Sequence, residues 1–254
     1  MKAIILSAGQ GSRLGHLTHD RPKCLIDFNG RSLLDRQLDT LAACGIDEVV
    51  VVTGFRDEQI EASLARRVGG PKVRTVFNPF YKVAENVASC WMARHELTED
   101  FLLLNGDVVF EPAVARTALE RSVGPVSVTV NHPREYDADD MKVELQGKRV
   151  VAIGKDLPIE RVGAESIGMM VFRGDGPGLF VAELERVMRT PEGLKSWFTQ
   201  VVHRMARGGL VESVSIDGLD WGEIDFPNDL EAMQAVVEGW GSTERSASAA
   251  SHSR

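Results

Sequence analysis

The chain has 254 residues, of which 43% are hydrophobic and 26% charged, the profile of an ordinary globular protein with a sizeable core. Its 29 Lys and Arg residues against 37 Asp and Glu residues give a net charge of -8, whereas a general nucleic-acid binder normally carries a basic surplus. No apolar stretch approaches membrane-spanning length, no signal peptide precedes the first strand-like run, and the three cysteines lack zinc-type spacing. We therefore expect a cytoplasmic protein that binds neither nucleic acid nor membrane.

The first half of the chain alternates between apolar strand-like runs and amphipathic helical segments. Ser32 can cap the first of these helices, and Gly45 can end it. The expected order is strand 2–8, helix 32–45, strand 48–54, helix 57–67, strand 73–78, helix 87–97 and strand 101–107. This alternation predicts an α/β fold with a Rossmann-like, doubly wound, mostly parallel sheet.

The second half contains shorter strand-like runs with turns between them, including a hairpin turn at 146–148. The expected elements are strands 127–131, 141–145, 149–154 and 166–172, helices 177–189 and 192–207, strand 211–216, and a last helix entered through 221–233. Because no Gly/Ser-rich linker separates the halves, we expect a single domain over 1–240, with a small β-rich subregion that makes the sheet mixed. The small, polar segment 241–254 predicts a disordered tail.

The loop after the first strand combines glycines with cations. Gly9 and Gly11 follow the strand closely, Arg13 comes next, and Lys23 lies ten positions further on. In a doubly wound sheet, ligands bind beyond the carboxyl ends of the strands, where this loop is expected. Glycines let backbone amides approach phosphate oxygens, and Arg and Lys supply positive charge, so the loop indicates a phosphate site.

Three interpretations of this loop compete. The dinucleotide fingerprint G-x-G-x-x-G requires a glycine at position 14, which is Leu14, and a Walker-type G-x-x-x-x-G-K-[ST] motif is absent. An NAD-binding oxidoreductase is therefore disfavoured. A plain glycine turn with solvated charges remains the alternative for an isolated G-x-G.

A longer pattern decides among these interpretations. The segment from Gly9 to Leu25 matches G-x-G-x-R-L-x-x-L-T-x-x-x-P-K-x-L, and it resembles the nucleotidyltransferase family that makes nucleotide-activated sugars and phosphocholine. The resemblance implies that the loop holds a nucleoside triphosphate, with Arg13 on the β and γ phosphates and Lys23 on the α phosphate and the incoming phosphate. These two side chains are the expected catalytic residues. The expected nucleotide-binding residues are Leu6, Ser7, Ala8, Gly9, Gly11, Ser12, Arg13, Asn86, Asn105 and Gly106.

Two acidic residues are candidates for a metal site. Asp107 ends the apolar run FLLLNGD, and Asp225 lies in EIDFPND just before the last helix. Considered alone, Asp107 is typical of a turn and Asp225 of a helix cap. The resemblance implies that both bind Mg²⁺, an ion that prefers carboxylate and phosphate oxygens.

Two further segments resemble the phosphocholine cytidylyltransferase branch of this family and favour CTP as the nucleotide. Residues 78–91 are similar to its N-P-x-Y-x-x-x-N-N-x-x-S-L segment, although Glu85 replaces the first of the paired asparagines. Residues 139–158 are similar to strands that cover the acceptor in that branch. The resemblance therefore implies that the β-rich subregion lies on the acceptor side.

Four residues are candidates for holding the acceptor. Lys142 could meet its phosphate or phosphonate, whereas surface exposure is the alternative. Trp221 and Glu223 could hold an ammonium group, with Glu165 a further candidate of the same kind, whereas core packing is the alternative for Trp221.

The expected function is Mg²⁺-dependent transfer of a cytidylyl group from CTP to a small acceptor, with release of pyrophosphate. The acceptor would be a phosphocholine-like compound, an aminoalkyl or hydroxyalkyl phosphonate, or a polyol phosphate, and a homo-oligomer is compatible with the sequence. One alternative is a sugar-1-phosphate nucleotidyltransferase that uses dTTP, UTP or GTP. A second alternative is a non-catalytic nucleotide-binding module.

Overall fold

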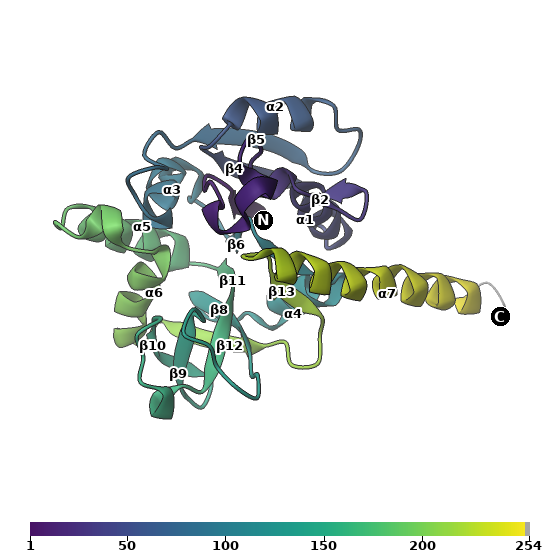
Figure 1. The fold of residues 1–254 in the computed structure, drawn as a ribbon. Coiled ribbons are helices and arrows are strands. Elements are labelled where there is room, and N and C mark those ends of the chain that lie inside the picture. Colours follow the sequence, from purple (N-terminus) through teal and green to yellow (C-terminus); the bar gives the residue numbers. More distant parts are fainter. Residues whose placement is uncertain (252–254) are drawn as a thin grey trace.

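The computed structural model describes the backbone of residues 1–251 and the side chains of residues 1–240. Its centre is a nine-stranded mixed sheet (Figure 1). In spatial order the strands are β5 (Lys72–Phe77), β4 (Glu48–Thr53), β1 (Lys2–Leu6), β6 (Phe101–Asn105), β11 (Ala164–Phe172), β8 (Val126–Asn131), β12 (Val211–Ser215), β10 (Arg149–Ile153) and β9 (Lys142–Gln146). The expected α/β fold with a mixed sheet is confirmed, but the sheet is less parallel than expected: between neighbours in this order, four pairings are parallel and four are antiparallel.

The first four strands of this order form the parallel half of the sheet. Strands β4, β1 and β6 are apolar almost throughout because helices cover both faces. One face packs against α3 (Asn86–Met92), α5 (Gly176–Met188) and α6 (Phe198–Arg207). The other face packs against α1 (Leu33–Ala43), α2 (Asp57–Ala65) and α4 (Pro112–Arg121). As expected, the Ser32 side chain caps α1 by accepting from the amide of Asp35.

The second half of the sheet is largely antiparallel. Strand β11 runs antiparallel to both β6 and β8, and β9 and β10 form a hairpin around Gly147, whose φ is 62°. Strand β9 also pairs with β11, so this half of the sheet curls over itself. It lies at the bottom of Figure 1, below the parallel half. This is the β-rich subregion that the sequence predicted.

Two long helical predictions are broken in the structure. Helix α3 ends at Met92 and is followed by a 3-10 turn at Arg94–Glu96. The segment 192–207 divides into a 3-10 turn at Gly193–Lys195 and α6, because Ser196 and Trp197 adopt extended backbone conformations between them. Helix α4 and two short two-stranded pairs were not predicted. These pairs are β2 (Asp27–Phe28) with β3 (Arg31–Ser32), and β7 (Val108–Phe110) with β13 (Trp221–Glu223).

The last helix, α7, spans Pro227–Ser251. A disordered tail is predicted over 241–254. The side chains of these residues, and the backbone from residue 252 onward, lie outside the described part of the chain. The tail therefore stays a prediction. Among the described residues, none of the helices combines the length and apolar composition needed to cross a membrane.

A close approach of two strand ends positions the site. The amide of Gly106, just after β6, donates to the carbonyl of Leu6 at 3.0 Å. A Cβ on Gly106 would lie 2.7 Å from that carbonyl oxygen and would also collide with the hydroxyl of Ser7. Only glycine therefore lets the turn after β6 lie against the loop after β1.

Replacing Gly106 with alanine should destabilise the fold by about 1–3 kcal/mol, because the backbone must move to admit the methyl group. Gly9→Ala is the matched control, since a Cβ at Gly9 would meet nothing within 4 Å. It should change the free energy of unfolding by less than about 0.5 kcal/mol. Urea unfolding of the two variants and the wild type measures both values, and equal effects would contradict the crowding argument.

Candidate active site

Three segments meet at the carboxyl edge of the parallel half. They are the loop after β1, the turn after β6 and the segment after β13, which the pairing of β13 with β7 brings alongside the turn. Together they enclose a cavity of about 320 Å³. Its lining residues are Leu6, Ser7, Gly9, Gly11, Ser12, Arg13, Lys23, Cys24, Glu85, Gly106, Asp107 and Asp225.

Lys23 bridges the two acids that the sequence singled out. Its Nζ lies 2.9 Å from Oδ2 of Asp107 and 2.6 Å from Oδ1 of Asp225. Burial disfavours the charged form of Lys23, but the two carboxylates outweigh burial and raise its pKa. Gly11 leaves room for this side chain: its φ is 67°, and a Cβ there would lie 2.9 Å from the Cβ of Lys23.

Arg13 reaches one of these two acids, Asp225, from the mouth of the cavity. Its Nη1 lies 3.3 Å from Oδ2 of Asp225 and 3.2 Å from Oδ2 of Asp139, and its guanidinium lies over the ring of Phe226. Burial raises the pKa of Asp225, but Lys23 and then Arg13 outweigh it, and the net shift is downward. Arg13 is 46% exposed, so it is free to turn toward an incoming phosphate.

The two aspartates fit a Mg²⁺ ion that is shared with a substrate. The second oxygen of Asp107, Oδ1, is buried without a hydrogen-bond partner among the described residues. Nowhere in the described part of the chain do three or more His, Cys, Asp or Glu side chains form a group that could hold a metal ion. Mg²⁺ commonly takes one or two carboxylates and completes its coordination with water and substrate phosphates, which is what this pair of acids would offer.

A smaller cavity of about 150 Å³ adjoins the first and faces the β-rich half. Burial, followed by the charges of Asp107 and Asp225, raises the pKa of Glu223 in its wall to about 8. The lining residues are Arg13, Asn86, Asn105, Asp107, Asp139, Met141, Lys155, Ser166, Gly168, Trp197, Phe198, Thr199, Glu223 and Asp225. The two cavities share Arg13 and both aspartates, so a triphosphate in one and an acceptor in the other would meet at these groups.

Most of the expected nucleotide-binding residues line one of the two cavities. Asn86 and Asn105 belong to the smaller cavity and the others to the larger, with one exception. Ala8 lines neither, because it is buried and its carbonyl accepts from the amide of Phe55.

Three of the four acceptor candidates lie outside both cavities, which corrects the sequence-based expectation. Lys142 is 6% exposed, and its Nζ donates to the carbonyls of Ala138 and Lys155. Glu165 accepts a hydrogen bond from Asn131. Trp221 packs against the hydrophobic core cluster to which residues of α4 belong. Of the four, only Glu223 lines the smaller cavity.

A cluster of side chains on the wall of the smaller cavity was not predicted from the sequence. The Nζ of Lys155 lies 3.4 Å from Asp139 and 5.2 Å from the ring centre of Trp197. The indole nitrogen of Trp197 donates to the carboxylate of Glu85 at 3.0 Å. Glu85 is the residue that replaces the first of the paired asparagines. Lys155 lies just beyond the end of β10, but β10 is antiparallel to both of its neighbours, so the strand-end argument used for Asp107 does not apply to it.

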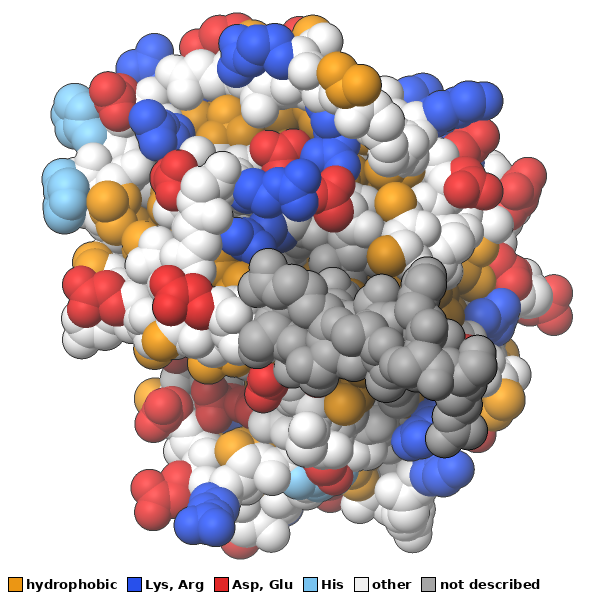
Figure 2. Space-filling model, turned by 90° about the vertical axis from the view of Figure 1, so that its right-hand side faces the viewer, with side chains coloured by type: hydrophobic (Ala, Val, Ile, Leu, Met, Phe, Trp, Pro, Cys, Tyr) orange, Lys and Arg blue, Asp and Glu red, His pale blue; other side chains and the backbone are white. Residues whose placement is uncertain are grey.

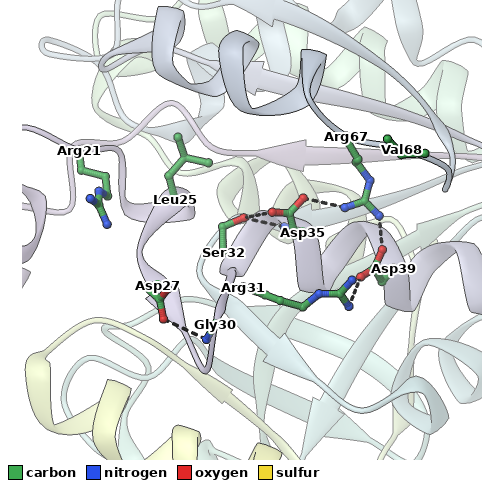
Figure 3. A pocket seen from close by; sticks show the side chains of 10 residues that line it. All are labelled: Arg21, Leu25, Asp27, Gly30, Arg31, Ser32, Asp35, Asp39, Arg67 and Val68. Carbon is green, nitrogen blue, oxygen red and sulfur yellow. Dashed lines mark hydrogen bonds and ion pairs between the residues drawn. The ribbon is translucent and has the colours of Figure 1, made fainter.

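Charge on the surface is finely mixed. On the face shown in Figure 2, basic side chains lie next to acidic ones among the residues drawn in colour, in keeping with the net charge of -8. A cavity of about 410 Å³ against α1 has the same character (Figure 3). There Arg67 forms ion pairs with Asp35, at 2.6 Å, and with Asp39. Arg31 forms a further ion pair with Asp39. These arginines are already neutralised, so the network links α1 to the end of α2 rather than forming an anion site.

Known proteins are similar to this chain over most of its length. The chain is 33% identical to a CMP-5'-(3-aminopropyl)phosphonate synthase of Streptomyces rubellomurinus, over 90% of this chain and 37% of that protein. It is 26% identical to a CTP:phosphoglutamine cytidylyltransferase of Campylobacter jejuni, over 92% of this chain and 99% of that one. Across three curated relatives that share 33% identity with it, the chain spans 37–52% of their length.

The fold is similar to a solved structure of the inositol-1-phosphate CTP transferase from T. maritima. The TM-score is 0.78 at 22% identity, and the match covers 90% of each chain. The MobA-like NTP transferase domain matches residues 3–195, well over half of the chain. The chain therefore belongs to the MobA-like NTP transferase family.

Proposed function

We propose that this protein transfers a cytidylyl group from CTP to a small phosphate or phosphonate acceptor in a Mg²⁺-dependent reaction. The observation that carries the proposal is the ion-pair cluster of Lys23 with Asp107 and Asp225, beside a glycine loop and Arg13. Nucleotidyl transfer needs positioned substrates and positive charge against the charge that develops on phosphate oxygens. This cluster offers two cations and a pair of metal-binding carboxylates in one place.

In the proposed reaction, an oxygen of the acceptor attacks the α phosphorus of CTP. The bond from the α phosphorus to the bridging oxygen breaks, and pyrophosphate leaves. Arg13 and the loop amides hold the leaving pyrophosphate, while Lys23 neutralises charge on the α phosphate. Asp107 and Asp225 would hold Mg²⁺, which when bound supplies further positive charge. A phosphate monoester is mostly ionised at neutral pH, so the acceptor needs no general base.

Two observations support the choice of substrates. Relatives of this chain carry names that specify CTP or a CMP product, and residues 78–91 resemble the cytidylyltransferase branch. The acceptor-side cavity is small and holds both signs of charge, with Lys155 opposite Asp139 and Glu223. A compact acceptor with an anionic phosphonate or phosphate and a polar or cationic far end would match these charges.

A substrate panel tests this proposal. Pyrophosphate release is measured with CTP, UTP, dTTP and GTP, each combined with phosphocholine, aminoalkyl phosphonates, inositol phosphate and glucose 1-phosphate. We expect Mg²⁺-dependent release with CTP and one of the small acceptors, and loss of release on chelation of the metal. Turnover with glucose 1-phosphate and another nucleotide would contradict the cytidylyl assignment.

Lys23→Ala and Asp107→Ala should each lower turnover by about 10³-fold or more, because the first removes a positive charge at the α phosphate and the second removes a proposed ligand of the metal. The folded structure should persist in both variants. Lys2→Ala is the control, since Lys2 pairs with Glu96 away from the cavity. Near-wild-type rates in either active-site variant would contradict the catalytic roles proposed for Lys23 and Asp107.

Cys24 tests whether transfer is direct. It lines the larger cavity, but it is buried, and burial raises its pKa to about 12, so the thiol is not ionised at neutral pH. Cys24→Ala should therefore keep turnover within about fivefold of the wild type and cost about 1 kcal/mol of stability. A loss as large as that of Lys23→Ala would indicate a covalent intermediate on the sulfur.

A further inference from the structure

Backbone groups in and around the turn that bears Asp107 form hydrogen bonds with three separate segments of the chain. The amide of Gly106 donates to the carbonyl of Leu6 at the end of β1, at 3.0 Å. The carbonyl of Asp107 accepts from the amide of Ile224, just after β13, also at 3.0 Å. The third attachment comes from helix α1 and is made by the side chain of Gln37.

The carboxamide of Gln37 spans the turn. Its Nε2 donates to the carbonyl of Asn105 at 2.9 Å and to the carbonyl of Val108 at 2.8 Å. These carbonyls lie on either side of the Gly106–Asp107 dipeptide. One nitrogen with two N–H donors therefore fixes both ends of the segment that presents the carboxylate.

The Gln37 side chain also leaves one buried polar atom without a hydrogen-bond partner among the described residues. Gln37 is 2% exposed on a helix face whose neighbours Leu34, Leu38 and Leu41 are apolar core residues. Its Oε1 is buried and has no hydrogen-bond partner among the described residues. An apolar side chain would avoid that buried, unpaired oxygen, but it could not donate to the turn. The benefit of the amide lies in the two hydrogen bonds that it makes to the turn.

We propose that Gln37 is a positioning residue that orients the carboxylate of Asp107 toward the metal. The inference rests on the proposed function, in which Asp107 binds Mg²⁺. The orientation is specific: Oδ2 of Asp107 faces Lys23 at 2.9 Å, while Oδ1 is buried and unpaired. A turn held only by Leu6 and Ile224 would lack support on the α1 side, and the carboxylate would sample other directions.

The test combines direct metal binding with local dynamics. Mn²⁺ binding is followed by electron paramagnetic resonance, in the presence of α,β-methylene CTP, for the wild type and Gln37→Met. Methionine keeps the length of the side chain and removes both donors. We expect Mn²⁺ affinity and kcat to fall by about 10- to 100-fold, as is typical when support for a metal ligand is lost, with the KM for the acceptor nearly unchanged. In the metal-free protein, amide exchange should accelerate across 105–108.

Three further variants serve as comparisons. Leu38→Val trims a neighbouring core residue on α1 and should leave Mn²⁺ affinity and exchange across 105–108 as in the wild type. Gln37→Asn keeps the amide but shortens its reach, and it should reproduce the loss even if Gln37→Met folds poorly. Asp107→Ala shows how tightly Mn²⁺ binds when the carboxylate of Asp107 is removed.

The positioning role is overturned if Gln37→Met and Gln37→Asn bind Mn²⁺ as tightly as the wild type. It is also overturned if Leu38→Val loses as much affinity as they do, because the effect would then reflect general loosening of α1. A wild type that binds Mn²⁺ but shows no turnover with any nucleotide contradicts the proposed function alone. Full turnover together with unchanged binding in the Gln37 variants contradicts the positioning role alone.

Discussion

One ammonium group, that of Lys23, holds together two carboxylates from distant parts of the chain. Asp107 and Asp225 lie 84 and 202 residues away from it in sequence. Two partly buried carboxylates at one edge of a sheet repel each other, and a cation between them offsets that repulsion more strongly than it would in open solvent. A Mg²⁺ ion and a triphosphate would satisfy the same three groups in another way. Under the proposed function, these three groups would therefore exchange partners when metal and nucleotide bind.

Contacts elsewhere in the fold keep the side chains of Lys23, Asp107 and Asp225 close together. Gly11 leaves room for the Lys23 side chain, and Gly106 lets the Asp107 turn lie against the loop after β1. The short pairing of β7 with β13 brings the Asp225 segment alongside that turn. None of these contacts is local in sequence. The site therefore depends on the whole parallel half being formed, with α1 packed beneath it.

Much of this arrangement could be predicted from the sequence, and the reasons are physical. Strands β4, β1 and β6 are buried on both faces, so they appear as uninterrupted apolar runs. Side chains just past the ends of such strands converge at one edge, which is why the loop residues and Asp107 were identified. Strands β7 and β13, by contrast, are three residues long, and no periodic pattern can develop over that length.

The acceptor side was harder to predict because its side chains are placed by tertiary contacts. Lys142 begins β9, but it is buried, and its ammonium donates to two backbone carbonyls instead of lining the cavity. Trp221 lies on a short strand whose partner, β7, was not predicted, and it packs into the core instead. Trp197 reaches the cavity wall only because a predicted helix is interrupted just before it. In each case the deciding contact joins segments far apart in the chain.

The most direct measurement is a crystal structure of the protein with Mg²⁺ and α,β-methylene CTP. The account predicts that the Lys23 ammonium leaves Asp107 and Asp225 for the phosphate oxygens, and that both carboxylates coordinate the metal. A complex in which Lys23 still bridges the two aspartates, with the triphosphate bound elsewhere, would contradict it.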